Sequence, residues 1–364
     1  SWDFFNPESN VSGDIGCHTS AIFDGRYAYF TPYYNGQYYG NFLRYDTNKN
    51  FNNGNSWKSF DPSANGVGIN PIGYQGGVFD GKYIYFTPHG YKNASGSFEP
   101  HGEFLRYDTT KDFQLNGAWK SYDPGLDFLD AQGRDIDGYA GASFDGRYIY
   151  FVPYKNNDSY NSNFLRYDIK GNFDQSNSWS LFDSNSLGIN IRGYIGAVYD
   201  GEHIYFVPHY NGQYHGNFLR YNIKGDFNDI GSWTSYNPGL NGLGSDFVGY
   251  RNAVYDGKYI YFVPNRNSTG GYNSKVLRYN VSGNFNSLNS WDYFDLKTKI
   301  SLNSGGHISS AFDGKYIYFI PYYNGSVHNG NFIRYDTTKN FQDTNSWSQF
   351  ETSVNVNSSL RGYW

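Results

Sequence analysis

The apolar positions of this chain fall in short runs separated by turn-forming residues, and the same arrangement returns six times. Each copy begins with small and apolar residues that lead to an aromatic residue and Asp-Gly, as in Phe79-Asp80-Gly81. Asp-Gly between two β-like runs predicts a tight hairpin, because glycine accepts the left-handed conformation of the turn. Proline cannot donate to a sheet ladder. The second strand of each copy is therefore expected to end at its proline: Pro32, Pro88, Pro153, Pro208, Pro264 and Pro321.

The second half of each repeat is its most regular part. A third run carries Leu-Arg-Tyr or Ile-Arg-Tyr, a phenylalanine lies seven residues after this arginine, and a tryptophan lies six residues further on. Because all six copies keep these spacings, we interpret the Phe and Trp as packing residues. We expect each arginine to be held by the Asp of the hairpin turn or by loop carbonyls. The functional alternative is a ring of six exposed arginines that binds an anion.

Four short strands in each repeat, repeated at a fixed period, predict one domain over residues 1–364, an all-β, six-bladed β-propeller of four-stranded antiparallel blades. The first strand of each copy is rich in Gly and Ala, which suits the narrow axis of such a fold, and the bulky aromatic residues fall on the wider strands. The repeats cover roughly residues 13–62, 70–124, 135–184, 190–238, 246–295 and 303–351.

The two ends of the sequence, residues 1–7 and 353–364, are expected to be overlap or closure segments. Ser1-Trp2-Asp3-Phe4-Phe5 matches the fourth strand of a repeat, and Leu360-Arg361-Gly362-Tyr363 matches the approach to a first strand. Three explanations stay open. The ends latch a six-bladed ring, the chain is cut from a longer array, or a terminal strand is donated to another molecule by β-augmentation.

Composition narrows the partners. The 39 Tyr and 30 Phe beside only 17% charged residues indicate β-rich, half-buried surfaces. A formal charge of −5 without a basic cluster argues against nucleic acid as a partner. The sequence contains no run of eighteen apolar residues, so we expect no membrane insertion. Seven N-x-S/T sequons, and the absence of a leader and of Met, lead us to expect a secreted, extracellular or cell-surface protein. Its one cysteine, Cys17, is interpreted as a small packing residue.

The repeat pattern Phe-Asp-Gly-Arg/Lys-Tyr-Ile-Tyr-Phe-Val-Pro-Tyr, then Arg-Tyr-Asp, then the spaced Phe and Trp, resembles repeats of secreted bacterial β-propeller proteins whose function is mostly unassigned. The resemblance covers nearly the whole chain. In general plan the chain is also similar to multi-bladed propeller lectins, although the sialidase Asp box is absent and no lectin-specific signature is present. The resemblance implies a propeller architecture and a location outside the cell, and says little about function.

The loops between the second and third strands vary most among the copies, and variable loops on a fixed scaffold often carry binding sites. The first, fourth and sixth of these loops combine aromatic rings with amides. A ring can stack on the C–H face of a neutral sugar while amides pair with its hydroxyls. Alternatively, the tyrosines only cover the loops and the Asn-Gly pairs only turn the chain. The candidate ligand-binding residues are Tyr33, Tyr34, Asn35, Tyr38, His209, Tyr210, Asn211, Tyr214, His215, Tyr322, Tyr323 and His328.

A second candidate site is the mouth of the expected channel, where the first strands begin. In a closed ring His18 and His307 would be neighbours and could form a two-His metal site or an acid/base pair, whereas tyrosine in the other copies favours packing. No cofactor is predicted and the metal is unknown, but Asp14, Asp135, Asp137 and Asp246 are candidate Ca²⁺ ligands or catalytic carboxylates. The channel-mouth residues are His18, Tyr74, Tyr139, Tyr194, Tyr250 and His307.

No local motif for a nucleophile, a zinc site or a nucleotide is present in the sequence. We therefore predict an extracellular binding or adhesion module whose partner is a carbohydrate or glycoconjugate. Two alternatives stay open. One is a glycoside hydrolase or lyase that acts on polysaccharide at the central channel. The other is a structural subunit that self-associates through a donated terminal strand.

Overall fold

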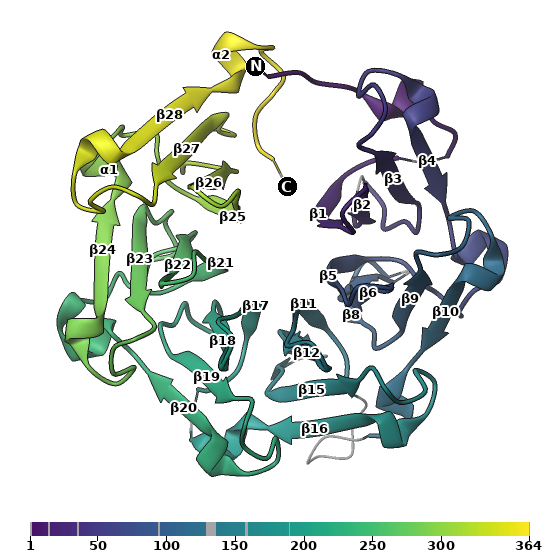
Figure 1. The fold of residues 1–364 in the computed structure, drawn as a ribbon, viewed down its shortest axis with the longest axis horizontal. Coiled ribbons are helices and arrows are strands. Elements are labelled where there is room, and N and C mark those ends of the chain that lie inside the picture. The colour runs from purple at the N-terminus through teal and green to yellow at the C-terminus, as the bar shows by residue number, and fades with distance from the viewer. Residues whose placement is uncertain are drawn as a thin grey trace. The chain divides into compact units, whose positions relative to one another are not determined.

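A computed structural model of the chain describes residues 2–13, 15–34, 36–93, 95–128, 136–156, 159–188 and 190–363. The chain forms two compact units, unit 1 (Ser1–Ser184) and unit 2 (Asn185–Trp364). Each unit contains three four-stranded antiparallel blades, so the chain has the all-β, six-bladed propeller fold that the repeats predict (Figure 1). Within a blade we call the strands A to D in chain order.

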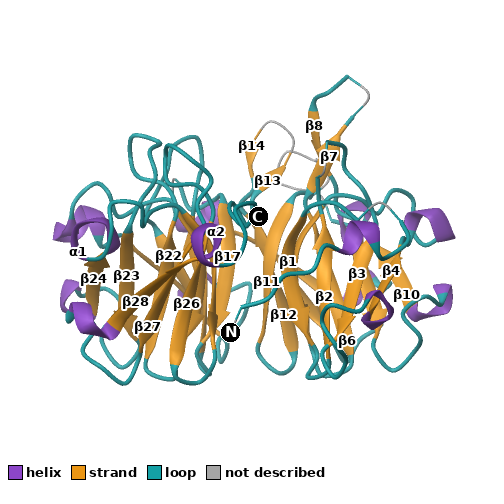
Figure 2. Ribbon diagram, turned by 90° about the horizontal axis from the view of Figure 1, so that it is seen from above, coloured by secondary structure: helices purple, strands orange, loops and turns teal. Residues whose placement is uncertain are grey.

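The blades of unit 1 are numbered 1 to 3. Blade 1 consists of β1 (His18–Phe23), β2 (Tyr27–Pro32), β3 (Phe42–Asp46) and β4 (Trp57–Phe60); blade 2 of β5 (Tyr74–Phe79), β6 (Tyr83–Pro88), β9 (Phe104–Asp108) and β10 (Trp119–Tyr122); and blade 3 of β11 (Tyr139–Phe144), β12 (Tyr148–Pro153), β15 (Asn163–Asp168) and β16 (Trp179–Asp183). Two hairpins, β7 (Gly90–Lys92) with β8 (Phe98–Pro100) and β13 (Lys155–Asn156) with β14 (Ser159–Tyr160), extend from the same side of this unit (Figure 2).

The blades of unit 2 are numbered 4 to 6. Blade 4 consists of β17 (Tyr194–Tyr199), β18 (His203–Pro208), β19 (Phe218–Asn222) and β20 (Trp233–Tyr236); blade 5 of β21 (Tyr250–Tyr255), β22 (Tyr259–Pro264), β23 (Lys275–Asn280) and β24 (Trp291–Asp295); and blade 6 of β25 (His307–Phe312), β26 (Tyr316–Pro321), β27 (Asn331–Asp336) and β28 (Trp347–Glu351). The α-helices of the described residues are α1 (Leu296–Lys299) and α2 (Thr352–Asn355).

Strand boundaries follow the sequence signals. Every B strand ends at its proline, and every D strand begins at its tryptophan directly after a short 3-10 helix. These helices are Gly54–Ser56, Asn116–Ala118, Ser176–Ser178, Ile230–Ser232, Leu288–Ser290 and Thr344–Ser346. Further short helical turns lie at Pro7–Ser9, Ser63–Asn65, Pro124–Leu126, Ser184–Leu187 and Gly239–Leu243.

The spaced Phe and Trp are packing residues, as predicted. The Trp119 indole is sandwiched between Phe86 of its own blade and Phe60 of the preceding blade, with ring centroids 5.7 and 5.3 Å away. Its Nε1 donates a 2.9 Å hydrogen bond to the Phe113 carbonyl. The same indole-to-carbonyl bond occurs in all six blades, at 2.9–3.0 Å. Trp119 therefore joins two neighbouring blades of unit 1, and in all six blades the indole bond fixes the C-to-D connection.

The Asp of each A-to-B turn binds the turn itself. In blade 2, Asp80 Oδ1 accepts from the amides of Lys82 and Tyr83, and its Oδ2 accepts from the Tyr85 hydroxyl at 2.9 Å. The other five blades repeat these three bonds. The carboxylate thus closes the hairpin and satisfies a tyrosine hydroxyl of strand B.

The recurring arginine packs against aromatic rings, whereas we expected it to be held by this Asp or by loop carbonyls. In blade 2 the Arg106 guanidinium lies 4.3 Å from the ring centroid of Tyr83 and 4.9 Å from that of Phe173, which belongs to the next blade. Arg44 and Arg278 sit between two rings in the same way. The turn carboxylate already has three donors, so the arginine packs as a cation between aromatic faces instead.

First strands of neighbouring blades approach closely through glycine. A Cβ added at Gly76, where φ is +89°, would lie 3.2 Å from Cα of Gly141 in the next blade. At the chain ends, Phe5 stacks on Trp57 of unit 1 at 5.4 Å, and Tyr363 contacts Phe332 of unit 2 at 4.8 Å. Both terminal segments thus pack on blades of their own unit, as the corresponding residues of a complete repeat would do.

Candidate functional site

The B-to-C loops of four blades form small hairpins, and each presents two facing side chains. The first side chain of each pair lies two residues after the proline that ends strand B. The positive φ of glycines such as Gly212, at +114°, allows the tight turn between the two. We call these the loop pairs: Tyr34/Tyr38, Tyr210/Tyr214, Arg266/Tyr272 and Tyr323/His328.

The three loop pairs of unit 2 follow one another in contact. The Tyr210 and Tyr214 rings lie 4.8 Å apart, and a Cβ added at Gly270 of the next loop would lie 3.9 Å from the Tyr214 ring. The Tyr272 ring is 5.1 Å from the Tyr323 ring of the loop beyond. We call this set the aromatic row: Tyr210, Tyr214, Arg266, Tyr272, Tyr323 and His328.

The chemistry of the aromatic row is mostly that of uncharged rings. The Arg266 guanidinium lies 3.8 Å over the Tyr272 ring and donates to the Gly270 carbonyl at 3.0 Å, so its charge is used within its own loop. Burial raises the pKa of Tyr272, so this phenol stays neutral at physiological pH. Members of the row are half-buried, except His328, which is exposed. Each ring therefore has support on one side and an accessible part.

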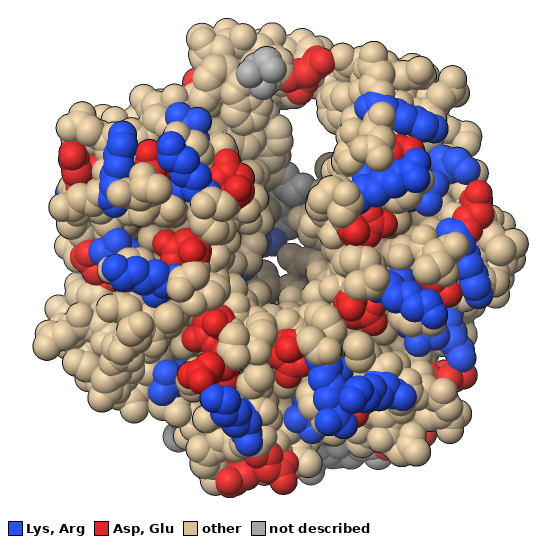
Figure 3. Space-filling view, in the orientation of Figure 1, with Lys and Arg blue, Asp and Glu red and all other residues tan. Residues whose placement is uncertain are grey.

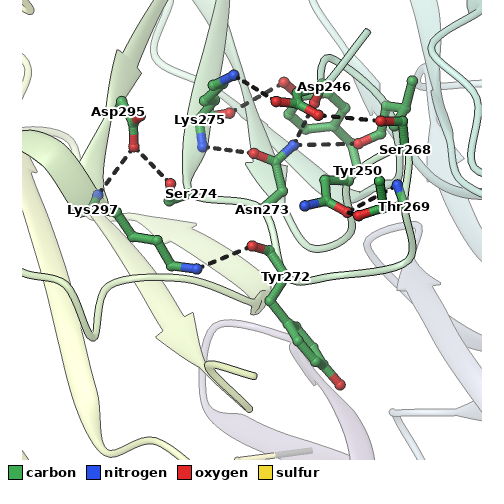
Figure 4. A network of polar contacts seen from close by, with 12 residues as sticks. Asp246, Tyr250, Ser268, Thr269, Tyr272, Asn273, Ser274, Lys275, Asp295 and Lys297 are labelled. Atoms are coloured by element: carbon green, nitrogen blue, oxygen red, sulfur yellow. Dashed lines mark hydrogen bonds and ion pairs between the residues drawn. The ribbon is translucent and has the colours of Figure 1, made fainter. Parts of the chain in front are cut away.

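The loop that carries Tyr272 is held by a polar network (Figure 4). Asn273 donates through Nδ2 to the Asp246 carbonyl at 2.8 Å, and its Oδ1 accepts from the Lys275 amide at 3.0 Å. Lys275 Nζ pairs with the Asp246 carboxylate at 3.1 Å, and Lys297 Nζ donates to the Tyr272 carbonyl at 3.2 Å. Because its backbone is fixed on both sides, the Tyr272 ring is presented with little loss of conformational entropy on binding.

Three of the predicted ligand-binding residues lie inside unit 2 and bond to its own backbone. His209 Nδ1 is 3.0 Å from the Tyr250 carbonyl, and Asn211 Nδ2 donates to the Asn190 carbonyl at 3.1 Å. Burial lowers the pKa of His209 to about 3 and that of His215 to about 4, so both rings are neutral. These residues tie loops to neighbouring strands, and we do not include them in a ligand surface.

The B-to-C loops of unit 1 carry a shorter set of rings. Tyr34 lies 5.0 Å from Tyr38, and Tyr38 lies 5.2 Å from Tyr33. Tyr33 in turn contacts His89, which stacks on Tyr154 of the following blade at 5.6 Å. Tyr34 is 36% exposed, so its ring is the most accessible of the set. The predicted ligand residue Asn35 lies outside the described residues. In unit 2, Tyr322 contacts His328 at 5.5 Å beside the aromatic row.

The predicted channel-mouth residues begin the A strands, but most of them are buried. Tyr74, Tyr139, Tyr194 and Tyr250 have no exposed surface. Their hydroxyls donate at 2.7–3.1 Å to the carbonyl of a residue at or just before the start of strand C in their own blade. His307 is equally buried, whereas His18 is half-buried. The two histidines belong to different units, and burial lowers the pKa of His307 to about 3 and that of His18 to about 4. The tyrosines at this position therefore support the blades from inside.

Charge is spread rather than concentrated. On the face that Figure 3 shows, basic and acidic side chains are interleaved in both units. Several of them form ion pairs, such as Arg26 with Asp46 at 3.0 Å and Lys224 with Glu202 at 2.6 Å. Across the described ranges, no three His, Cys, Asp or Glu side chains are grouped so as to hold a metal ion. No helix in the described part of the chain has the length and apolar character to cross a membrane.

Comparison with known proteins adds no relative: no protein family and no curated protein matches the chain. The site therefore stands on its own geometry. Sequence reasoning missed Arg266 and Tyr272, because the fifth loop lacks the Tyr-Asn-Gly pattern of the others. A usable signal was present, since Arg266 lies two residues after Pro264 just as Tyr210 lies two residues after Pro208.

Proposed function

We propose that the protein is a binding module that holds a neutral carbohydrate chain along the aromatic row of unit 2. The observation that carries this proposal is the succession of three loop pairs, in which the Tyr210 ring contacts Tyr214, Tyr214 lies beside Gly270 of the middle loop, and the Tyr272 ring contacts Tyr323. Saccharide rings present C–H faces that stack on aromatic side chains. A line of such faces fits several consecutive residues of a linear polysaccharide better than one small molecule.

Hydrogen-bonding groups beside the row support the same ligand class. Gln213 is exposed next to Tyr214, and its amide can both donate to and accept from sugar hydroxyls. The tyrosine hydroxyls of the row have the same dual capacity. The one cation of the row, Arg266, is satisfied by the Tyr272 ring and a carbonyl, so an anionic ligand gains little there. Tyr34 and Tyr38 of unit 1 offer similar chemistry on a shorter surface.

A glycan array tests this proposal with the wild-type protein and two variants. Tyr210→Ala/Tyr323→Ala removes a ring near each end of the aromatic row, and Phe23→Ala removes a 57% exposed aromatic side chain of strand β1 outside the row. We expect binding to neutral glycans that is lost or strongly weakened in the row variant and kept in the control. No binding to any neutral glycan, or equal binding by the row variant, would refute the proposal.

Any glycan that binds should also be incubated with the protein and assayed for new reducing ends. Release of the glycan unchanged supports a binding module. New reducing ends would instead favour a hydrolase or lyase. The location outside the cell, the bacterial resemblance, bound Ca²⁺ and self-association stay predictions.

A further inference from the structure

Blade 6 contains a polar pocket whose lining shares no residue with the aromatic row. It has a volume of about 490 Å³, and its lining includes Asn331, Gln349 and Glu351 from strands β27 and β28. Ser301 and Asn303, from the connection that precedes strand β25, close one side. This volume lies in the range of small-molecule sites. All of these residues belong to unit 2.

The corresponding place in blade 5 is filled by the protein itself. There Phe247 packs against Tyr293 with ring centroids 4.8 Å apart, and Lys275 Nζ lies 5.2 Å over the Phe247 ring. The Lys275 ion pair with Asp246 closes the site further (Figure 4). Phe247 has 1% of its surface exposed. Blade 5 thus has an apolar plug and an ion pair where blade 6 has a pocket.

Four substitutions between the repeats account for the difference. Register places Asn331 of blade 6 where blade 5 has Lys275, because Asn331 pairs with Glu351 as Lys275 pairs with Asp295. By the same alignment Gln349 replaces Tyr293, Ser304 replaces Phe247 and Asn303 replaces Asp246. Each replacement shortens a side chain or removes a charge or a ring.

The plug is general and its loss is specific to blade 6. The residue three positions before strand A is buried and apolar in the first five blades and is a serine in the sixth. In chain order these residues are Ile15, Pro71, Ile136, Ile191, Phe247 and Ser304. The short serine side chain therefore leaves space in blade 6 that an apolar side chain fills in the other blades.

One of the residues that line the pocket carries an unused hydrogen-bond acceptor. Both amide hydrogens of Asn331 are engaged, since Nδ2 donates to Ser304 Oγ at 3.2 Å and to Gln349 Oε1 at 3.0 Å. Its Oδ1 has no hydrogen-bond partner and is buried, as the 3% exposure of the residue indicates. A buried acceptor without a donor costs about 1–3 kcal/mol, so a ligand that donates to it is favoured.

We propose that this pocket binds one ring of a neutral, polyhydroxylated ligand, a saccharide residue. Asn331 Oδ1 accepts from one ligand hydroxyl, Gln349 Nε2 donates to another, and the Glu351 carboxylate accepts a third. The negative charge of Glu351 disfavours an anion, and the amide donor of Gln349 disfavours a metal ion. A sugar residue supplies both donors and acceptors without a charge.

Saturation-transfer NMR on the full chain tests the proposal with a mixture of the methyl α-glycosides of glucose, mannose, galactose and N-acetylglucosamine. The main variant is Gln349→Tyr, which restores the blade 5 residue at an exposed position and should fold normally. The matched control is Ser235→Tyr, which adds the same ring at the corresponding exposed position of blade 4. Ser304→Phe, which restores the plug, is a second variant.

We expect a signal from at least one glycoside, with an affinity about tenfold weaker in Gln349→Tyr, the scale of one lost hydrogen bond. Ser235→Tyr should leave the affinity unchanged. The signal should persist in Tyr210→Ala/Tyr323→Ala, which separates this pocket from the aromatic row. No signal from any glycoside, a signal insensitive to Gln349→Tyr, or one lost only in the row variant would overturn the pocket proposal.

Discussion

Replacing His307 by tyrosine should stabilise unit 2, and most strongly at acidic pH. Strands A of blades 4 and 5 begin with Tyr194 and Tyr250, whose hydroxyls donate to backbone carbonyls at 2.8 and 3.1 Å. Blade 6 has His307 at this position, fully buried, and neither ring nitrogen has a hydrogen-bond partner. His307→Tyr therefore restores both the volume and the hydrogen bond of the other blades.

The size of the stability gain at acidic pH follows from the pKa of His307, which burial lowers from 6.5 to about 3. The unfolded chain takes up a proton at this histidine below pH 6.5, while the folded chain does not until about pH 3. Stability contributed by the neutral ring is therefore complete above pH 6.5 and falls as the pH is lowered through that window. At pH 4.5, two units below 6.5, the loss is about 3 kcal/mol.

Urea unfolding followed by tryptophan fluorescence at pH 7.0 and pH 4.5 measures both effects. At pH 7.0, His307→Tyr should be more stable than the wild type by about 1 kcal/mol, the net value of one hydrogen bond. At pH 4.5 the advantage should grow by about 2–3 kcal/mol. The control His328→Tyr makes the same replacement on an exposed loop side chain and should not change the pH dependence. An equal advantage at both pH values would refute the reasoning about His307.

Three further substitutions test the scaffold by urea unfolding. Asp145→Asn replaces the oxygen that accepts from the Tyr150 hydroxyl and should lower the free energy of unfolding by about 1–3 kcal/mol. An unchanged urea midpoint would show that the turn carboxylate does not stabilise the blade. Trp291→Phe leaves the Phe285 carbonyl without its 3.0 Å donor and should cost at least about 1–3 kcal/mol; a neutral result would contradict the inter-blade packing. Gly76→Ala places a Cβ at positive φ, so we expect a loss of about 1–2 kcal/mol, and tolerance would contradict the close strand approach.

The architecture could be predicted because each repeat carries its own strand signals. Asp-Gly and proline mark the ends of the A and B strands. The spacing of Phe and Trp is the same in all six repeats although their loops differ, which indicates that these residues pack in the blades. The partner of the arginine was predicted wrongly. In blades 1, 2 and 5 the arginine packs between rings of two blades, and a contact between repeats leaves no spacing signal within one repeat.

The candidate site was only partly accessible from sequence. Loop composition pointed to Tyr210 and Tyr323, but it could not separate these half-buried rings from His209, which faces inward and bonds to a neighbouring strand. Burial depends on which side of the loop hairpin a side chain occupies. The pocket of blade 6 was also missed, because it arises from the absence of a plug at Ser304, and that absence is visible only when the blades are compared in register.

The most direct test of the central claim is a calorimetric titration with a neutral oligosaccharide series of increasing length, chosen from the glycan that binds best on the array. Wild-type protein should bind longer chains more tightly until the aromatic row is covered. Tyr272→Ala interrupts the middle of the row, so it should weaken the longest chain by about 1–2 kcal/mol and remove most of the gain with length. An affinity independent of chain length, or unchanged in Tyr272→Ala, would contradict a carbohydrate chain bound along this row.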